Sequence, residues 1–327
     1  MSDRYRFFVA LLGWVAFVPA WAQVPQALGT TYASSFGAAA TIHPKATQAA
    51  GQVLENGGNA IDAAIAATLT LGVVDGFNSG LGGGLFALVR YADGEIQAID
   101  AREQAPADAT EDLFIRDGQA VKSLSRTGAL AVGVPGSVLA LEQLHQRGGK
   151  LPLAVHYLKA AVLAEQGFPL TAHYAARIAR TQEDLQQFPQ SASIFLDPNG
   201  QAWPAGHVLK QPDLARSYLQ IADQGSQWFY HGEFAQKAEQ WMQANGGVIQ
   251  ASDFADYQLK IREPVVRTFA GFEFVGFPPP SSGGIHVAQM LDMLQRLGFK
   301  DLNAAQQAHW LAEVMKLAFA DRSRWLG

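Results

Sequence analysis

The chain has 327 residues, of which 49% are hydrophobic and only 16% are charged, and its formal net charge is -5. This composition is typical of a folded globular protein with one large or two smaller domains, and it argues against intrinsic disorder. The sequence has no run rich in lysine and arginine, so we expect no nucleic-acid partner. It also has no cysteine, which excludes disulfides, thiolate nucleophiles and cysteine-ligated metals within the chain.

The first 22 residues show the three parts of a secretory signal. Arg4 and Arg6 give a basic start, an uncharged apolar run covers 7–18, and Ala20-Trp21-Ala22 supplies small residues before a cleavage point. The apolar run is too short to form a stable transmembrane helix. A short membrane anchor and a buried first helix are the alternative interpretations. We expect residues 1–22 to be a signal peptide, the protein to be exported to the periplasm or secreted, and no stable membrane anchor.

Two helices are expected next. Residues 46–55 have a helical pattern, and the Gly57-Gly58 pair supplies a left-handed end to that helix. Asn59, with Asp62 three residues later, predicts the capped start of a second helix. The body of that helix, over 60–71, is almost entirely apolar, which indicates that it is buried.

A glycine-rich run, Ser79 to Gly84, precedes an expected hairpin with strands over 85–90 and 95–101. The run begins like a dinucleotide-binding fingerprint, but Leu85 stands where the third glycine belongs. The fingerprint also requires a strand before the helix, and here the helix comes first. We therefore expect no nucleotide site. We interpret the glycines as room for close packing of the strand start against the buried helix.

The remaining pattern predicts helices over about 135–260, a strand within 265–277, a helix over 285–297 and a last helix over 304–321. This order indicates a mixed α/β fold of the α+β type, because the regular alternation of a doubly wound sheet is missing. The zinc signature H-E-x-x-H is absent as well, so we expect no metal site.

A loop between the last strand and the following helix contains candidate site residues. Three prolines, 278–280, precede Ser281, Ser282, Gly283 and Gly284. One interpretation is a tight turn that caps the next helix. The other is a wall of an active-site cleft, because loops often carry functional residues. The residues themselves leave both interpretations open.

Arg102 is the second candidate, and it directly follows an expected strand between Asp100 and Glu103. One interpretation is a surface ion pair, which would contribute little to stability. The other is a guanidinium group that binds a carboxylate, since its planar fork can donate to both oxygens at once. Taken alone, these residues favour the surface ion pair.

Six motifs resemble those of the γ-glutamyltransferase family and occur in the family's order. They lie at 49–64 (with GGNAIDAA), 79–86 (SGLGGGLF), 100–106 (DAREQAP), 134–137 (VPGS), 278–285 (PPPSSGGI) and 316–327 (KLAFADRSRWLG). The resemblance covers the chain from about residue 40 to its last residue. One departure is VDGFN at 74–78, where many members have a Glu-Pro pair, so the exact substrate stays open.

The resemblance implies an N-terminal-nucleophile hydrolase fold, an αββα sandwich that would be incomplete in this chain. It also implies a precursor that cuts itself into a large and a small subunit, with residues 23–327 forming the large-subunit region. An N-terminal threonine of the small subunit would attack the γ-glutamyl amide of glutathione or a related compound and pass the acyl group to water, an amino acid or a peptide. No cofactor is implied. Arg102 would bind the α-carboxylate of the γ-glutamyl group.

No threonine in the chain matches the family's nucleophile. We therefore expect the catalytic residue downstream of Gly327, and we expect this fragment alone to be inactive. The expected partners are γ-glutamyl compounds and the small subunit of the same precursor. Two alternatives stay open, which are a glutaryl-type β-lactam (cephalosporin) acylase of the same family and a non-catalytic secreted fragment.

Overall fold

The structure is a computed structural model, and it describes residues 31–326. The signal peptide expected over residues 1–22 lies outside this range. The helices are α1 (Pro44–Glu55), α2 (Ala60–Val74), α3 (Ser137–Gly148), α4 (Leu153–Gln166), α5 (Ala172–Arg180), α6 (Gln182–Gln186), α7 (Pro189–Phe195), α8 (Pro212–Gln224), α9 (Ser226–Tyr230), α10 (Glu233–Ala244), α11 (Ala251–Ala255), α12 (Gly283–Arg296) and α13 (Ala304–Trp325). The strands are β1 (Thr31–Ser34), β2 (Gly37–Ala40), β3 (Leu85–Arg90), β4 (Ile96–Ala101), β5 (Ile115–Arg116), β6 (Gln119–Ala120), β7 (Phe168–Pro169), β8 (Val208–Leu209), β9 (Lys260–Arg262), β10 (Val265–Phe269) and β11 (Phe272–Gly276).

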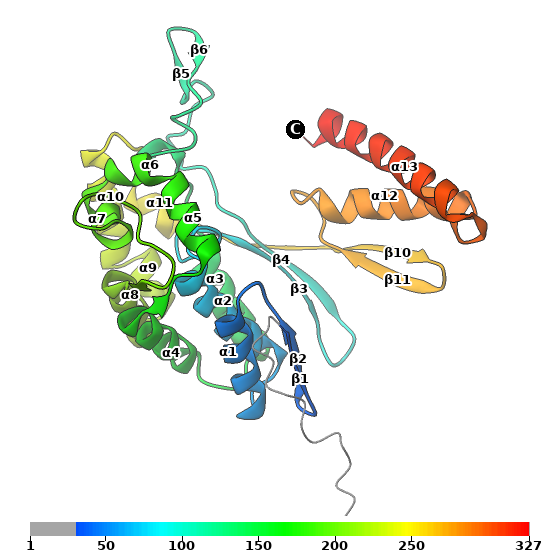
Figure 1. Cartoon of the computed structure of the whole chain (residues 1–327), viewed down its shortest axis with the longest axis horizontal. Coiled ribbons are helices and arrows are strands. Elements are labelled where there is room, and N and C mark those ends of the chain that lie inside the picture. Colours follow the sequence, from blue (N-terminus) through cyan, green and yellow to red (C-terminus); the bar gives the residue numbers. More distant parts are fainter. Residues whose placement is uncertain (1–30, 327) are drawn as a thin grey trace, which may run out of the picture.

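The elements form two groups, and the chain passes from one to the other between β9 and β10 (Figure 1). Helices α1 to α11 gather in the main body, and β3 and β4 extend from it. The hairpin β10–β11 and the helices α12 and α13 form an outlying group. This arrangement of helices and antiparallel strands confirms the expected mixed α/β class.

The predicted end of α1 and the predicted start of α2 are confirmed, whereas α1 begins two residues earlier than expected, at Pro44. Gly57 adopts the left-handed conformation (φ +87°) directly after the last turn of α1. Asn59 and Asp62 form a complete capping box at the start of α2, since each side chain accepts a hydrogen bond from the other's backbone N–H. The helix then runs three residues further than expected, to Val74.

Helix α2 is the centre of the main core, as its apolar sequence predicts. Ile65 and Val73 have no exposed surface. Helices α3 and α4 pack directly on α2, and α8 packs on α4. The Tyr218 hydroxyl of α8 donates a hydrogen bond to the carbonyl oxygen of Leu69 at 2.9 Å, which ties α8 to α2 as well. Most of the helix is buried, although Ala60 and Ala64 are exposed, and this burial explains why few polar residues interrupt it.

The central sheet has three antiparallel strands in the order β3-β4-β9. Leu85 pairs with Ala101, so the start of β3 lies beside the end of β4. Strand β9 pairs with the other edge of β4, with Lys260 opposite Asp100. The hairpin β3–β4 was predicted, whereas the pairing of β9 was not.

The single strand expected within 265–277 is wrong, because two strands form a hairpin there. Ala270 and Gly271 connect β10 to β11, and both have positive φ angles (53° and 85°). Two successive residues of this kind are typical of the tight turns that reverse a strand. Helix α12 packs on the resulting hairpin, and α13 packs on α12. Within residues 31–326, no helix has both the length and the apolar character needed to cross a bilayer.

Candidate substrate-binding site

Arg102 has an exposed side chain on a fixed backbone. It follows the last residue of β4, where Ala101 pairs with Leu85. Its backbone N–H donates to Oδ1 of Asp100 at 3.1 Å, and its carbonyl oxygen accepts a hydrogen bond from the Tyr257 hydroxyl at 2.9 Å. Across residues 31–326 no side chain forms an ion pair or hydrogen bond with its guanidinium group. The structure therefore leaves the guanidinium group available to a ligand.

The two acidic neighbours of Arg102 have other partners. Asp100 is 6% exposed, and its Oδ2 accepts a hydrogen bond from Nε of Arg262 at 2.6 Å. Oε1 of Glu103 accepts a hydrogen bond from the backbone N–H of Gly84 at 2.8 Å. The surface ion pair that the sequence favoured for Arg102 is thus not formed with either residue.

Three of the sequence motifs, at 79–86, 100–106 and 134–137, meet where the chain leaves β4 at Arg102. A Cβ atom on Gly84 would lie less than 3.0 Å from Cα of Arg102, so only glycine allows this approach. A Cβ atom on Gly136 would also lie less than 3.0 Å from the Tyr257 hydroxyl oxygen and from the carbonyl oxygen of Ala101. The Gly83 carbonyl oxygen also accepts hydrogen bonds from the backbone N–H groups of residues 136 and 137.

The interpretation of the glycine run needs a correction. We expected its glycines to pack on the buried helix, and only Gly80 does so, close to Gly72 of α2. Gly84 packs instead against the end of β4. The antiparallel register explains this, because it places the start of β3 beside the residues that follow β4.

The proline-serine-glycine loop lies between β11 and α12. Its first residue, Phe277, packs its ring on that of Phe86 in β3, with centroids 4.4 Å apart. Ser282 precedes the first residue of α12, but its side chain makes no capping hydrogen bond. Instead, Oγ of Ser281 accepts a hydrogen bond from the backbone N–H of Gly283 at 3.3 Å.

The helix after this loop begins at Gly283, two residues earlier than expected. A Cβ atom on Gly284 would lie less than 3.0 Å from the backbone of Gly276 and Phe277. The second glycine therefore lets the first turn of α12 approach the end of β11. Gly283 and Gly284, which were expected in the loop, are thus the first residues of α12.

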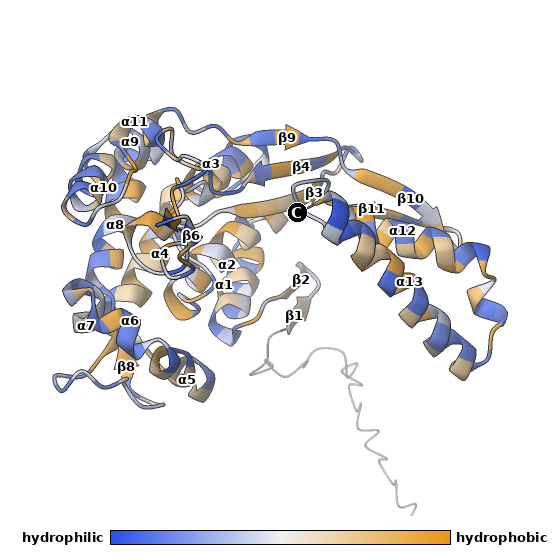
Figure 2. Cartoon of the chain, turned by 90° about the horizontal axis from the view of Figure 1, so that it is seen from above, coloured by the Kyte–Doolittle hydropathy of each residue, from blue (hydrophilic) through white to orange (hydrophobic). Residues whose placement is uncertain are grey.

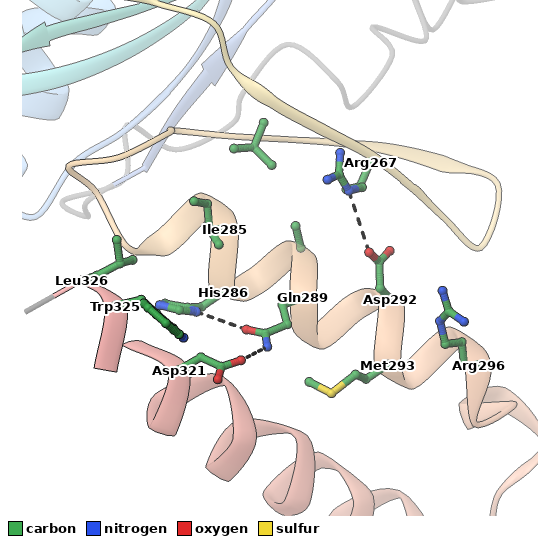
Figure 3. Close-up of a pocket in the computed structure, with 12 residues that line it drawn as sticks. Arg267, Ile285, His286, Gln289, Asp292, Met293, Arg296, Asp321, Trp325 and Leu326 are labelled. Atoms are coloured by element: carbon green, nitrogen blue, oxygen red, sulfur yellow. Dashed lines mark hydrogen bonds and ion pairs between the residues drawn. The ribbon is translucent and has the colours of Figure 1, made fainter. Parts of the chain in front are cut away.

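A cavity of about 640 Å³ opens one residue beyond this loop (Figure 3). Its walls come from β10, α12 and α13 and consist of Val265, Arg267, Ile285, His286, Ala288, Gln289, Asp292, Met293, Arg296, Asp321, Trp325 and Leu326. A chain of polar contacts crosses it, because Nδ1 of His286 lies 3.2 Å from Oε1 of Gln289, and Nε2 of Gln289 donates to Asp321. Neither Arg102 nor residues 281–284 belong to these walls. A cleft role for Ser281, Ser282, Gly283 and Gly284 stays a prediction.

A buried histidine–aspartate pair lies inside the main body, away from Arg102. Nε2 of His156 in α4 is 3.5 Å from Oδ1 of Asp62 in α2, and both side chains are fully buried. Burial lowers the pKa of His156, and the nearby Asp62 carboxylate opposes that shift. The contact therefore joins a carboxylate to a neutral imidazole at neutral pH.

Asp62 itself has a pKa below its usual value. Burial acts to raise the pKa, but hydrogen bonds from the backbone N–H groups of Asn59, Lys150 and Leu151 outweigh this effect. The buried Asp62 carboxylate is thus explained by its structural role in capping the start of α2, and His156 packs against it. In the part of the chain that the structure describes, no group of three or more histidine, aspartate and glutamate side chains could hold a metal ion.

Tyr257 and Arg262 lie close to the Arg102 turn, although neither was among the residues predicted for the site. Tyr257 lies in the segment before β9, and Arg262 ends that strand. Each is separated from its partner by more than 150 residues of sequence. No local pattern marks them, because the contacts depend on the pairing of β9 with β4.

Comparison with known proteins gives a consistent assignment. The family model described as Gamma-glutamyltranspeptidase matches residues 46–327. The chain is 38% identical over 303 residues to the Acylase ACY 1 proenzyme of Pseudomonas sp. (strain V22), which covers 88% of this chain and 53% of that protein. It is also 38% identical over 298 residues to the Glutathione hydrolase proenzyme of Bacillus subtilis (strain 168), which covers 89% of this chain and 50% of that protein. The chain thus spans about half the length of these curated relatives.

A solved structure agrees with the sequence matches. The crystal structure of Helicobacter pylori gamma-glutamyltranspeptidase superposes with a TM-score of 0.86 and 36% sequence identity, over 90% of this chain and 86% of that one. This match confirms the fold class that the motifs implied. The sequence matches, the family model and the superposition all show that the chain belongs to the gamma-glutamyltranspeptidase family.

Proposed function

We propose that the full-length protein cleaves the γ-glutamyl amide of glutathione and related compounds and transfers the γ-glutamyl group to water, amino acids or peptides. The observation that carries this proposal is the state of Arg102, whose guanidinium group is exposed and unpaired within residues 31–326 while its backbone is held at both polar groups. A planar guanidinium can donate to both oxygens of a substrate carboxylate at once. The α-carboxylate of a γ-glutamyl group is a ligand of this kind.

The proposed chemistry divides between two parts of the protein. Arg102 binds the α-carboxylate and so fixes the position of the γ-amide. A threonine at the N-terminus of a small subunit attacks the amide carbon, and its own amine takes the hydroxyl proton. The amine of the substrate leaves with a proton, and an ester-linked γ-glutamyl enzyme is left. Water or an acceptor amine then cleaves that ester. We place this threonine in the region that corresponds to the remaining half of the relatives.

A second candidate function is an acylase that accepts a glutaryl side chain. It is favoured by the 38% identity to a protein named Acylase ACY 1 proenzyme. Arg102 could bind the terminal carboxylate of a glutaryl group in the same manner. Hydrolysis of γ-glutamyl-anilide and glutaryl-anilide by the full-length protein separates the two. We expect faster turnover of the γ-glutamyl compound, and faster turnover of the glutaryl compound would overturn our first proposal.

The proposal also requires maturation and export. We propose that the precursor loses residues 1–22 on export and then divides into two subunits, as the proenzyme names of the relatives suggest for those proteins. N-terminal sequencing of both purified subunits tests this. The large subunit should begin at Gln23, and the small subunit should begin with a threonine. A reading frame with no threonine at a cleavable junction would contradict the enzymatic proposal.

A further inference from the structure

Both backbone polar groups of Arg102 bind side chains that are themselves held in place. Oδ1 of Asp100 accepts a hydrogen bond from the Arg102 backbone N–H, and Oδ2 of Asp100 accepts one from Nε of Arg262. The Tyr257 hydroxyl donates to the Arg102 carbonyl oxygen. We propose that Asp100, Arg262 and Tyr257 are positioning residues that hold Arg102 in the conformation in which it binds the substrate carboxylate. This inference rests on the proposed function.

The register of the sheet explains why Arg262 reaches Asp100. Arg262 pairs with Ala98 across the β4–β9 ladder, and Ala98 lies on the same face of β4 as Asp100. The two charged side chains are therefore diagonal neighbours. Asp100 is almost completely buried, and a buried carboxylate needs a charged or hydrogen-bonding partner. This requirement restricts the carboxylate to one orientation, in which its other oxygen faces the Arg102 N–H.

The Tyr257 hydroxyl is fixed by a stack of aromatic rings. Its ring lies parallel to that of Tyr230 in α9, with centroids 5.8 Å apart and an interplanar angle of 18°. The Tyr230 hydroxyl in turn donates to the carbonyl oxygen of Pro135 at 3.0 Å. Burial, followed by the negative charges of Asp100 and Glu103, raises the pKa of Tyr257. The hydroxyl therefore stays protonated and remains a donor at physiological pH.

The chemistry of the site requires such a support. Arginine has a long side chain with several rotatable bonds, and Arg102 stands just past the end of β4, where the pairing of β3 with β4 no longer holds its backbone. A binding group must be held to within about 0.5 Å to orient its ligand. If the carboxylate contact is the same in the ground state and the transition state, a looser Arg102 raises KM and leaves kcat nearly unchanged.

The test is a double-mutant cycle in the full-length protein with a γ-glutamyl-anilide substrate. Tyr257→Phe removes one hydroxyl and keeps the ring stack, and we expect it to raise KM about fivefold, the effect of one lost hydrogen bond. Asp100→Asn should act in the same direction. In an Arg102→Ala background neither change should raise KM further, because their effect passes through Arg102. Tyr91→Phe is the matched control, since its hydroxyl bonds Gln97 at the other end of the same hairpin.

Two outcomes would overturn the inference while leaving the proposed function intact. One is an unchanged KM in Tyr257→Phe, and the other is an additive effect of Tyr257→Phe in the Arg102→Ala background, as a merely structural role would give. An inactive wild-type protein would instead contradict the proposed function. In that case, hydrogen exchange of the peptide that contains Arg102 decides whether Asp100 and Tyr257 hold its backbone. Exchange should rise in Asp100→Asn and Tyr257→Phe and stay unchanged in Tyr91→Phe, and equal exchange in all variants would overturn the inference.

Discussion

Arg102 combines an exposed charge with a rigid backbone, an arrangement suited to binding a carboxylate. In the full-length protein we expect Arg102→Ala to raise KM strongly and to lower kcat/KM by about two to four orders of magnitude. The physical reason is that removal of one partner from a desolvated charge pair costs about 3–5 kcal/mol. Steady-state kinetics with a γ-glutamyl-anilide substrate measures both constants.

Two further variants test whether the effect of Arg102→Ala depends on the guanidinium group of this particular arginine. Arg102→Lys keeps the charge but loses the planar fork, so we expect an intermediate kcat/KM. Arg90→Ala removes an exposed arginine from β3 that pairs with Glu273, and it should have little effect. A near-normal KM and kcat/KM in Arg102→Ala would show that the exposed guanidinium has no role in substrate binding.

The buried pair of His156 and Asp62 should make stability depend on pH. The folded state lowers the pKa of His156 below the usual 6.5, so the unfolded chain binds a proton that the folded chain excludes. This contribution to stability is complete above pH 6.5 and declines as the pH falls below 6.5. The lowered pKa of Asp62 adds a second loss only below about pH 3.8.

We therefore expect His156→Gln to flatten the decline of Tm between pH 7.5 and pH 5.5. Circular dichroism melts at several pH values measure the slope for the wild-type chain and the variant. His231→Gln, at an exposed histidine after α9, is the control and should keep the wild-type slope. An unchanged slope in His156→Gln would mean that the buried imidazole is not the titrating group.

At the scale of elements, Gly136 is where the start of α3, the end of β4 and Tyr257 approach each other most closely. A Cβ atom there would overlap the Tyr257 hydroxyl and the carbonyl oxygen of Ala101. We expect Gly136→Ala to destabilise the chain by about 1–3 kcal/mol, which lowers Tm by several degrees. Gly82→Ala is the matched control, because no atom lies within 4 Å of its added Cβ. Equal midpoints in thermal melts of the two variants would contradict this packing argument.

The elements that could be predicted are those with local signals. The capping box at Asn59 and the left-handed Gly57 are contained in a few consecutive residues, and both are confirmed. The turn at Ala270 was missed, since alanine rarely adopts a positive φ angle and gives no turn signal. Arg102 was identified only through the family resemblance. Its support by Tyr257 could not be predicted, because it depends on strand pairing between distant segments.

At the scale of the whole molecule, the outlying group leaves an apolar surface uncovered. Figure 2 shows α12 and α13 apart from the main body, with hydrophobic residues along both helices. Val314 and Ala318 of α13 are buried, whereas Leu311, Met315 and Phe319 are 41–53% exposed. These three residues are spaced by four and therefore lie on one face of the helix. The helix thus has a wider apolar face than its neighbours in the structure cover.

An exposed apolar face of this kind favours association between copies. We expect the 327-residue chain to self-associate when it is produced alone, and light scattering after size-exclusion chromatography measures this. Met315→Glu places a charge in the exposed stripe and should shift the chain toward the monomer. Ala320→Glu adds the same charge on the opposite face of α13 and should leave association unchanged. A wild-type chain that stays monomeric and folds cooperatively at all concentrations would show that the face needs no cover.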